Sequence, residues 1–309
     1  MNSSEDSSAN SSAKSSETSS ANWIVDDRCT NCDVARQLAP DLIREHDRKS
    51  RLVRQPRDEA ERRQLLAAAH ACPTRSIRPG DGPLDRATDP FPLALDETGD
   101  VLLLGHNSRQ TAGATAYLCR RPTGWAMIDT PRYSESLAAR YEALGPVTDV
   151  LLTHRDHAAH GRAYADRLGA RLWIHEGDLA AAPDADRVLR GTDPVEVSPG
   201  LVAHPFPGHT LGSVLYVADG RYCFSGDSLY WSRTSGDIEV QEAVTWYSIE
   251  EQAASLERGL DALRFEWLLP GHGDKRRMPA EEADRRLRAL AVRARALRTK
   301  PVDFAAVRW

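Results

Sequence analysis

Four short segments of the chain place histidine or aspartate directly after a brief apolar run. In chain order they are 151–160 (LLTHRDHAAH), 206–210 (FPGHT), 225–228 (SGDS) and 269–273 (LPGHG). The chain has ten histidines, and five of them lie in these four segments. Imidazole nitrogens and carboxylate oxygens are the ligands that zinc and similar divalent metals take in proteins. The pattern therefore predicts a metal site.

Strand ends are the elements that must position these side chains. A strand end is rigid, and the loops after several strands can aim their side chains at one point. His157 and His160 are three residues apart, so they share a face if a helix starts there. The candidate catalytic carboxylates are Asp156 and Asp227. The candidate metal ligands are His154, Asp156, His157, His160, His209, Asp227 and His272.

The chemistry of such a site follows from the metal. A bound divalent ion lowers the pKa of its water toward neutrality, which makes hydroxide available at pH 7. The reaction class is hydrolysis, and an ester, a thioester, an amide and a phosphodiester all stay open as substrates. Basic and aromatic residues after Asp227 and His272 (Tyr230, Trp231, Arg233, Lys275, Arg276 and Arg277) are candidates to line a pocket for an anionic small molecule.

Composition limits the remaining function classes. The chain has 309 residues, 41% hydrophobic and 28% charged, as in globular proteins. Its net charge of -5 and pI of about 6.1 give no basic field for nucleic acid. No apolar run approaches the roughly 20 residues that span a bilayer, and the N-terminus lacks the features of a signal peptide. We expect a cytoplasmic protein with no nucleic-acid or membrane partner.

The chain divides by composition into four parts. Residues 1–21 are Ser-rich and predict a disordered tail. A compact block at 22–79 contains three cysteines and an amphipathic helix at 56–71, and the Pro- and Gly-rich stretch at 80–89 is a linker. From 90 to 309 strands and helices alternate. The predicted strands are 101–104, 114–119, 125–128, 150–153, 171–174, 201–204, 214–217, 222–225 and 267–269. The predicted helices are 134–144, 158–168, 249–264 and 279–298.

The ordered set Thr153-His154, Gly208-His209-Thr210, Gly226-Asp227 and Gly271-His272-Gly273 resembles the metallo-β-lactamase superfamily. The resemblance covers about residues 90–298 and implies an αββα sandwich with a two-metal site at one edge of the sheets. It also implies that His154 and His209 are ligands of one metal, that Asp227 bridges the two metals and that His272 is a ligand of the second.

The first motif departs from the family pattern H-x-H-x-D-H. Alignment from His154 puts Asp156 in the place of the second histidine, and it puts Ala158 and Ala159 on the Asp-His pair.

A second alignment starts from the downstream helix and Gly169. It puts Asp156 and His157 on the Asp-His pair and makes His154 the second histidine, with Leu152 in the first position. Both alignments keep His154 and leave Asp156, His157 and His160 as candidates for the other positions. A site with one metal and a site with two unequal metals both stay open.

The cysteine block, defined here as residues 22–79 with Cys29, Cys32 and Cys72, resembles a small ferredoxin. The resemblance rests on Cys29-Thr30-Asn31-Cys32 and on Cys72 followed by proline, and it implies a ferredoxin-like α+β domain in front of the sandwich. Ala35 stands where a single-cluster ferredoxin has its third cysteine, so three thiolates remain. The alternatives are a three-iron cluster, a cluster with Asp33 or water as fourth ligand, an empty relic fold, a zinc site and three reduced thiols.

Three functions follow from these patterns. The first is a metal-dependent hydrolase of a small molecule, with zinc or iron at one or two sites. The second is an iron-dependent oxidoreductase, in which an N-terminal iron-sulfur cluster and a redox partner supply electrons; Asp156 in place of a histidine suits iron. The third is a non-catalytic binding protein that keeps the fold with an incomplete site.

Overall fold

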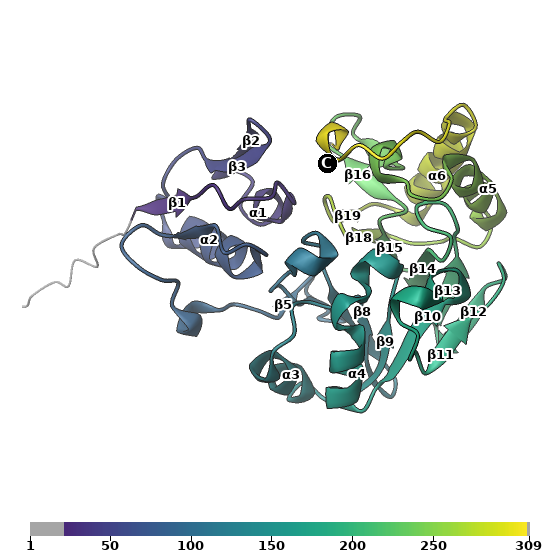
Figure 1. Ribbon diagram of the computed structural model, residues 1–309, viewed down its shortest axis with the longest axis horizontal. Helices are drawn as coiled ribbons and strands as arrows, with labels where there is room; N and C mark the ends of the chain where they lie inside the picture. Colours follow the sequence, from purple (N-terminus) through teal and green to yellow (C-terminus); the bar gives the residue numbers. More distant parts are fainter. Residues whose placement is uncertain (1–21, 308–309) are drawn as a thin grey trace, which may run out of the picture.

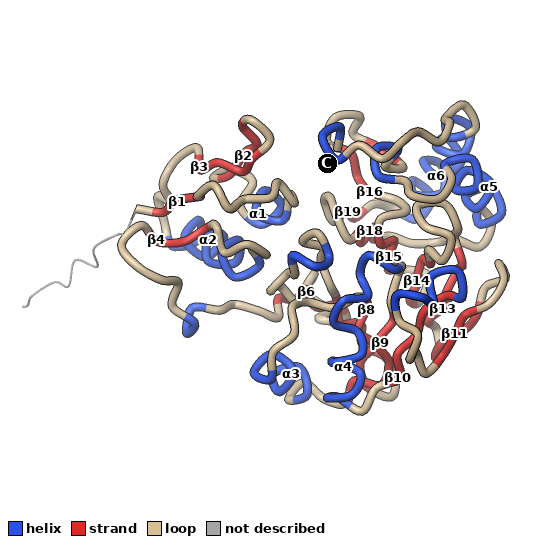
Figure 2. The backbone as a smooth tube through the Cα atoms, viewed as in Figure 1, coloured by secondary structure: helices blue, strands red, loops and turns tan. Residues whose placement is uncertain are grey.

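Two β-sheets packed face to face form the centre of the larger part of the molecule (Figure 1, Figure 2). The computed structural model describes residues 22–307, so the predicted tail at 1–21 lies outside the described residues. The first sheet has seven strands, in spatial order β11 (Arg187–Leu189), β10 (Arg171–His175), β9 (Val147–Leu151), β8 (Gly124–Ile128), β7 (Tyr117–Arg121), β6 (Val101–Leu103) and β5 (Leu93–Ala94). The second has six, in order β12 (Val195–Ser198), β13 (Leu201–Pro205), β14 (Val214–Ala218), β15 (Tyr222–Gly226), β18 (Trp267–Pro270) and β19 (Arg276–Arg277).

Alternation of side chains along the strands builds three apolar layers. In β14, Tyr216 faces the layer between the sheets, while Leu215 and Val217 face the opposite side. A period of two residues therefore lets one strand serve two cores. The helices α3 (Glu135–Glu142) and α4 (Gly161–Leu168) cover the first sheet, and α5 (Ile249–Gly259) and α6 (Ala280–Ala294) cover the second. This arrangement confirms the predicted αββα sandwich.

The helices begin and end at residues with a clear physical role. Ser248 Oγ accepts a hydrogen bond from the backbone N–H of Glu251 at 3.0 Å, which satisfies one of the free donors at the start of α5. Gly169 ends α4 with a left-handed φ of 67°. The predicted helix at 158–168 is two elements, because the 3-10 helix η3 (Arg155–His160) precedes α4.

The cysteine block has its own small core. Its elements are β1 (Trp23–Val25), α1 (Val34–Leu38), β2 (Ile43–His46), β3 (Lys49–Leu52), α2 (Glu59–Ala71) and β4 (Ile77–Pro79). Trp23, Leu42 and Leu65 are buried together between these elements. The predicted helix at 56–71 is confirmed as α2, which begins after Asp58, the acceptor of a hydrogen bond from the Glu61 backbone N–H.

Several short strands were absent from the sequence prediction. The hairpin β2–β3 is polar on both arms and turns through Asp47 and Arg48, which both have positive φ. Asp-Gly or Asn-Gly would have signalled such a turn. The other missed strands are β1, β4, β5, β11, β12, β16 (Tyr230–Ser232), β17 (Asp237–Glu239) and β19. Residues 114–116 are a loop rather than the start of β7, and Thr115 donates its backbone N–H to Gly271 O at 2.8 Å.

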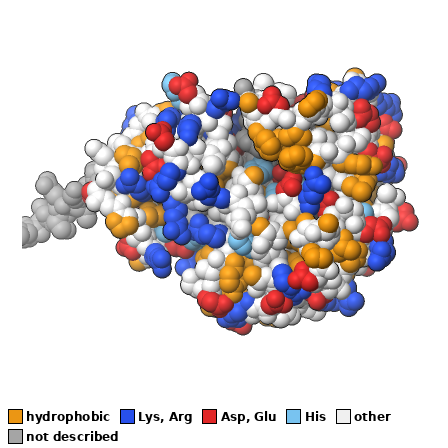
Figure 3. Space-filling model, viewed as in Figure 1, with side chains coloured by type: hydrophobic (Ala, Val, Ile, Leu, Met, Phe, Trp, Pro, Cys, Tyr) orange, Lys and Arg blue, Asp and Glu red, His pale blue; other side chains and the backbone are white. Residues whose placement is uncertain are grey.

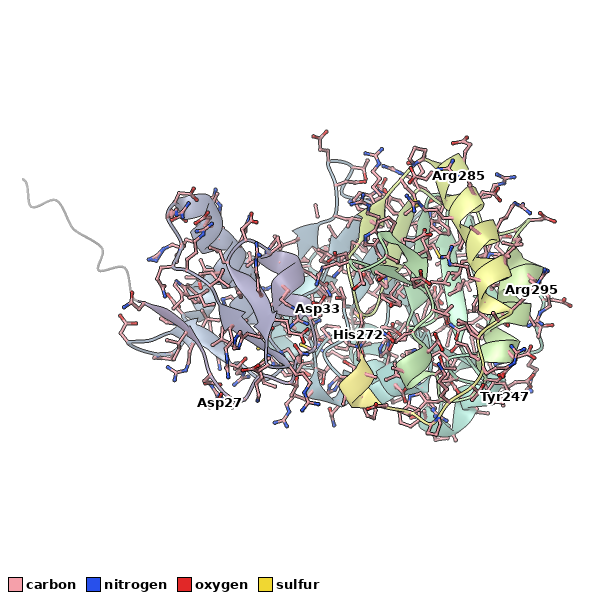
Figure 4. The ribbon with its side chains drawn as sticks, turned by 90° about the horizontal axis from the view of Figure 1, so that it is seen from above. Asp27, Asp33, Tyr247, His272, Arg285 and Arg295 are labelled. Carbon is pink, nitrogen blue, oxygen red and sulfur yellow. The ribbon has the colours of Figure 1, made fainter. Side chains whose placement is uncertain are left out.

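The cysteine block packs directly against the sandwich. Arg233 donates to Asp33 at 2.8 Å, and Lys275 Nζ donates to Gln37 Oε1. Asp33 and His272 both lie near this junction in Figure 4, whereas Arg285 lies at the far end of the sandwich. The boundaries proposed at 22–79, 80–89 and 90–309 stay a prediction. Among residues 22–307, no helix is long and apolar enough to cross a membrane.

Candidate metal centre

The four histidine and aspartate segments follow β9, β13, β15 and β18, and their donor side chains meet at one edge of the sandwich. The strands β13, β15 and β18 run in the same direction, so their carboxyl ends share that edge. β9 belongs to the other sheet, but the backbone N–H of Val214 donates to Thr153 O at 2.8 Å, which holds the end of β9 against the same edge. Topology therefore brings together residues that are more than 100 positions apart.

Asp227 is common to two groups of donors. His154, His209 and Asp227 form the first group, and His157, Asp227 and His272 form the second; within each group the ligand atoms all lie within 4.8 Å of one another. The distances from Asp227 oxygens to the four Nε2 atoms run from 3.6 to 3.9 Å. These separations are too long for hydrogen bonds. They approach the separation of about 3.4 Å between two donors that share one tetrahedral metal at bonds of about 2.1 Å.

Several of these donor atoms are buried and have no hydrogen-bond partner in the described part of the chain. They include Nε2 of His154, Nε2 of His157, both ring nitrogens of His209 and Oδ1 of Asp227. A buried polar atom left without a partner costs about 1–3 kcal/mol. Cations bound in the two groups would satisfy one nitrogen of each ring and the oxygen of Asp227, so the residues fit the divalent metal that the sequence pattern predicts.

The charges around the two groups also favour a cation. Burial and the neighbouring imidazoles hold the pKa of His154 well below its usual value, so this ring is neutral and free to act as a ligand. Burial lowers the pKa of His157, but the carboxylates of Asp129 and Asp227 outweigh burial and raise it to about 9. An environment that holds a proton this firmly on His157 also favours a metal ion in its place.

Asp129 orients His157 from below. Its Oδ2 lies 2.8 Å from His157 Nδ1, and its two oxygens also accept hydrogen bonds from the Thr153 backbone N–H at 2.8 Å and from Thr153 Oγ1. A carboxylate on the far nitrogen of a ligating histidine fixes the tautomer and leaves Nε2 free for the metal. Asp129 was not among the residues that the sequence pattern predicted for the site.

Asp178 fixes two of the donor loops and was missed from the sequence. Its Oδ2 accepts from the Arg155 backbone N–H at 2.8 Å and from Thr210 Oγ1 at 2.6 Å. One buried carboxylate thus ties the loop of His154 to the loop of His209. The only local signal was its position just after the predicted strand at 171–174.

Asp156 borders the first group of donors. Its Oδ2 lies 3.8 Å from His154 Nε2 and 3.7 Å from His209 Nε2, and its side chain is 38% exposed. This position fits the alignment that starts from His154, in which Asp156 replaces a histidine, whereas the place of His157 in the second group fits the other alignment, which puts His157 on the Asp-His pair. The other alignment puts Leu152 in a ligand position, but Leu152 is fully buried in the apolar core beneath α4.

His160 is not brought into either group of donors. Its Nε2 lies 2.8 Å from Ser108 Oγ. The segment is a 3-10 helix, in which three residues advance about 6 Å along the axis, so His160 lies a full turn beyond His157. His175 contacts the backbone of Gly177 and Gly191 and has a structural role.

A cleft of about 750 Å³ opens above the donors. Asp156, His157, His209, Asp227 and His272 form its floor. One wall comes from the cysteine block, with Thr30, Asn31, Cys32 and Arg48; the other comes from Trp246 and the C-terminal residues Phe304 and Val307. Figure 3 shows histidine at the floor of a hollow that hydrophobic side chains border.

The structure corrects the predicted lining of this cleft. Tyr230 and Trp231 are only 8% exposed, and Arg233 is held by Asp33 and Asp274. None of the six aromatic and basic residues proposed from the sequence lines the cleft. Some of them point into the junction with the cysteine block, and the others pack on the sandwich. The basic side chains that do line it are Arg48, Lys49 and Arg109.

The three cysteine thiols of the block come from two separate segments. Cys29 Sγ accepts from the backbone N–H groups of Asn31 and Ser50 at 3.4 and 3.3 Å. Cys72 Sγ lies 3.3 Å from Ser76 Oγ. Burial raises the pKa of Cys32 to about 12, and the nearby Cys72 and Cys29 add to the increase.

The described residues offer an iron-sulfur cluster three protein ligands. Ala35, at the position of the third cysteine, is 4% exposed and packs in the apolar core of the block. Asp33, the proposed fourth ligand, already accepts hydrogen bonds from Arg36, Gln37 and Arg233. Asp33 therefore does not fit that role, and a cluster would have to take its fourth ligand from outside the chain or hold three irons.

Two family models match the chain in the same order as these regions. The model described as "4Fe-4S single cluster domain of Ferredoxin I" matches residues 25–79, and the model of the metallo-beta-lactamase superfamily matches residues 111–290. A hydroxyacylglutathione hydrolase of Anaeromyxobacter dehalogenans is 43% identical over 83 residues, which are 26% of this chain and 31% of that protein. Another from Cereibacter sphaeroides is 31% identical over 134 residues, 42% of this chain and 52% of that protein.

The matches therefore span about a third to a half of the length of these relatives. Among solved structures, the DIM-1 metallo-beta-lactamase is similar to 65% of this chain and 95% of its own, with a TM-score of 0.50 and 17% sequence identity, which supports the shared fold. The superfamily model alone covers more than half of the chain, including all of the donor residues. The chain therefore belongs to the metallo-beta-lactamase superfamily.

Proposed function

We propose that the chain is a metal-dependent hydrolase that cleaves a small thioester in the cleft above the donors. The observation that carries this proposal is the position of Asp227, whose carboxylate is shared by two groups of imidazoles. The names of the similar hydroxyacylglutathione hydrolases support the thioester among the bonds that the site chemistry allows. An ester or an amide remains the runner-up substrate within the same mechanism.

The ligand assignment follows from the two groups. His154, Asp156 and His209 would hold one metal, His157 and His272 would hold the second, and Asp227 would reach both. Zinc and iron both accept this mixture of imidazole and carboxylate. A bound divalent ion supplies a Lewis acid and lowers the pKa of water, so that a nucleophile is present at neutral pH.

The protein side chains position and protonate the reactants. Asp227 fixes the separation of the two groups of donors. Burial raises the pKa of Asp156, but the nearby His209, whose Nε2 lies 3.7 Å from the carboxylate, outweighs burial, so the pKa lies below its usual value and the group is ionised at pH 7. Because Asp156 is the more exposed carboxylate at the floor of the cleft, it can orient the attacking water and accept its proton at a carboxylate oxygen.

His157 and His160 provide a matched test of this proposal. They lie on the same 3-10 helix, but only His157 belongs to a donor group. His157→Ala should lower bound metal and reduce hydrolysis of a hydroxyacylglutathione thioester by about a hundredfold or more, since a metal contributes several kcal/mol. His160→Ala should change both by less than about threefold. Metal content by elemental analysis and thiol release measure the two results; equal losses in both variants would contradict the proposal.

A second candidate function is an iron-dependent oxidoreductase. The observation that favours it is that Cys32 lines the same cleft as His157 and His272, so a cluster on the cysteine block would lie beside the metal centre. Zinc, iron and sulfide analysis of protein purified without oxygen separates the two functions. A protein with zinc alone that releases thiol from thioesters excludes the oxidoreductase. A protein with iron at the centre and no thioesterase activity excludes the hydrolase.

A further inference from the structure

A second cavity, of about 490 Å³, lies on the other side of the junction between the cysteine block and the sandwich. None of the metal donors lines it. Its walls come from the end of α2, from β4, from the segment around Leu84 and from the first turn of α3. The cavity therefore exists only because the two parts of the molecule pack together.

Six arginines line this cavity, against a single carboxylate. They are Arg28, Arg75, Arg78, Arg86, Arg132 and Arg140. The carboxylate is Asp89, and it is already neutralised by Arg140 at 2.6 Å and by a hydrogen bond with His106 at 2.8 Å. Figure 3 shows Lys and Arg side chains gathered over the cysteine block near its junction with the sandwich.

Three of the arginines have no carboxylate partner among residues 22–307. Arg28 and Arg78 pair with Asp26, but Arg75, Arg86 and Arg132 form no ion pair with the described residues. Burial lowers the pKa of Arg132, and the charge of Arg75 lowers it further, so the exposed guanidinium of Arg75 lies near the half-buried one of Arg132. Like charges held this way are costly unless an anion lies between them.

The first turn of α3 adds to the positive potential. Ser134, Ser136 and Leu137 line the cavity, and Ser134 is the N-cap of this eight-residue helix. Helix N-termini present free backbone N–H groups and a partial positive charge, which favour phosphate. Serine hydroxyls can donate to the same oxygens. Guanidinium groups, hydroxyls and a helix N-terminus together are the chemistry that recognises phosphate esters.

We propose that this junction cavity is a binding site for a phosphorylated small molecule with at least two negative charges, separate from the metal centre. Its volume falls within the range of small-molecule sites, about 300–1,000 Å³. A hollow with convergent arginines favours a compact ligand over the flat surface of an acidic protein. Bound there, the ligand would contact the cysteine block and α3 together and would stabilise their packing.

Inorganic pyrophosphate is the probe for the test, titrated by calorimetry into the full chain at constant ionic strength. Wild-type protein should bind it at one saturable site. Arg75→Gln/Arg132→Gln should bind it about a hundredfold more weakly, since each lost guanidinium removes a charge-assisted interaction worth roughly tenfold. Arg285→Gln is the control for net charge, because Arg285 is exposed at the far end of the sandwich, and it should bind within about twofold of wild type.

Two further variants keep the result interpretable. Asp227→Asn alters the metal centre and should leave the affinity for pyrophosphate unchanged. If Asp227→Asn lost pyrophosphate binding and the double arginine variant did not, the probe would bind at the metals and the proposal would be overturned. Arg75→Gln alone changes an exposed side chain, so it should fold normally and still weaken binding about tenfold. Absence of saturable pyrophosphate binding to wild type would also overturn the proposal. That is the result expected if the arginines dock an acidic protein instead. Equal weakening in Arg285→Gln would reduce the effect to general surface charge.

Discussion

The metal centre and the cysteine block meet at one cleft but differ in what a bound ion would add. In the metal centre, Nε2 of His154 and Nε2 of His157 are buried without a hydrogen-bond partner among residues 22–307. In the cysteine block, Cys29 Sγ already accepts two backbone N–H groups, and Cys72 Sγ lies within hydrogen-bond distance of a serine hydroxyl.

The difference shows which region depends on its ion. Without a cation, the metal centre keeps a buried carboxylate, Asp227, beside several imidazoles whose lone pairs are unused. Without a cluster, the raised pKa of Cys32, about 12, keeps that thiol protonated and neutral at pH 7. A neutral buried thiol costs little, because it behaves as a small apolar side chain. The metal centre is therefore a site that an ion completes, whereas Cys32 of the cysteine block leaves no buried charge uncompensated.

Asp227→Asn should have the largest effect, because it removes the one negative charge common to both groups of donors. Asparagine keeps the volume, so the fold should survive. We expect bound metal to fall at both positions and thioester hydrolysis to drop by more than about a thousandfold, the loss expected when several kcal/mol of charge stabilisation disappear. Elemental analysis and a thiol-release assay measure this. Asp261→Asn, at an aspartate that is 93% exposed, is the control and should match wild type; retention of full metal in Asp227→Asn would refute the shared carboxylate.

Asp129→Asn should have the next largest effect, because Asp129 acts on the metal only through His157. Loss of a carboxylate that orients a ligating histidine typically weakens metal binding by about 10- to 100-fold. Competition with a chromogenic chelator measures the affinity. Asp149→Asn is matched for burial, since Asp149 is 1% exposed, but it pairs with Arg171 and Trp173 away from the donors. That control should lower stability and leave metal affinity unchanged, and equal affinity in both variants would remove Asp129 from the mechanism.

The metal donors could be predicted from the sequence because each carries a local signature. An apolar strand followed by a histidine or aspartate, with a glycine just before His209, Asp227 and His272, is visible within about five residues, and family resemblance supplied the order. The partner of His157 carries no such signature. Asp129 lies 28 residues earlier in the chain, and only the pairing of β8 with β9 brings it beneath the ring.

The same reasoning separates the predicted strands from the missed ones. Strands in the middle of the sandwich are apolar on one or both faces, so their pattern is strong. The hairpin β2–β3 and the edge strand β19 are short and polar, and pairing alone defines them. The arginines of the junction cavity come from several segments between Arg28 and Arg140, so no window of the sequence reveals that they share one space.

Ala35→Cys tests the cysteine block by restoring the position at which its ligand set is incomplete. Cysteine is only slightly larger than alanine, so the buried site should accept it at a cost of about 1–2 kcal/mol. After reconstitution without oxygen, the variant should hold about four irons and four sulfides in the block, whereas wild type should hold three irons or fewer. Ala39→Cys is the matched control, since Ala39 is equally buried one turn later in the same core. A four-iron cluster in wild type would show that a ligand from outside the chain completes the set.

Asp89→Asn should have the smallest effect, because Asp89 belongs to neither ion site and its carboxylate forms hydrogen bonds only with His106, Arg140 and the Phe91 backbone among the described residues. Burial raises the pKa of Asp89, but hydrogen bonds and charge from His106 and Arg140 outweigh burial and hold the pKa well below its usual value. A carboxyl whose pKa is lower in the folded state stabilises the fold above its unfolded pKa of about 3.9, and this contribution is lost as the pH falls further.

Asp89→Asn should therefore lower the free energy of unfolding at pH 7 by about 1–2 kcal/mol, or about 2–4 °C in Tm, and the difference from wild type should shrink below about pH 3. Thermal unfolding at several pH values measures it, with metal and iron content unchanged; a difference that grows toward acid pH would show that the carboxylate is strained rather than stabilised at the junction.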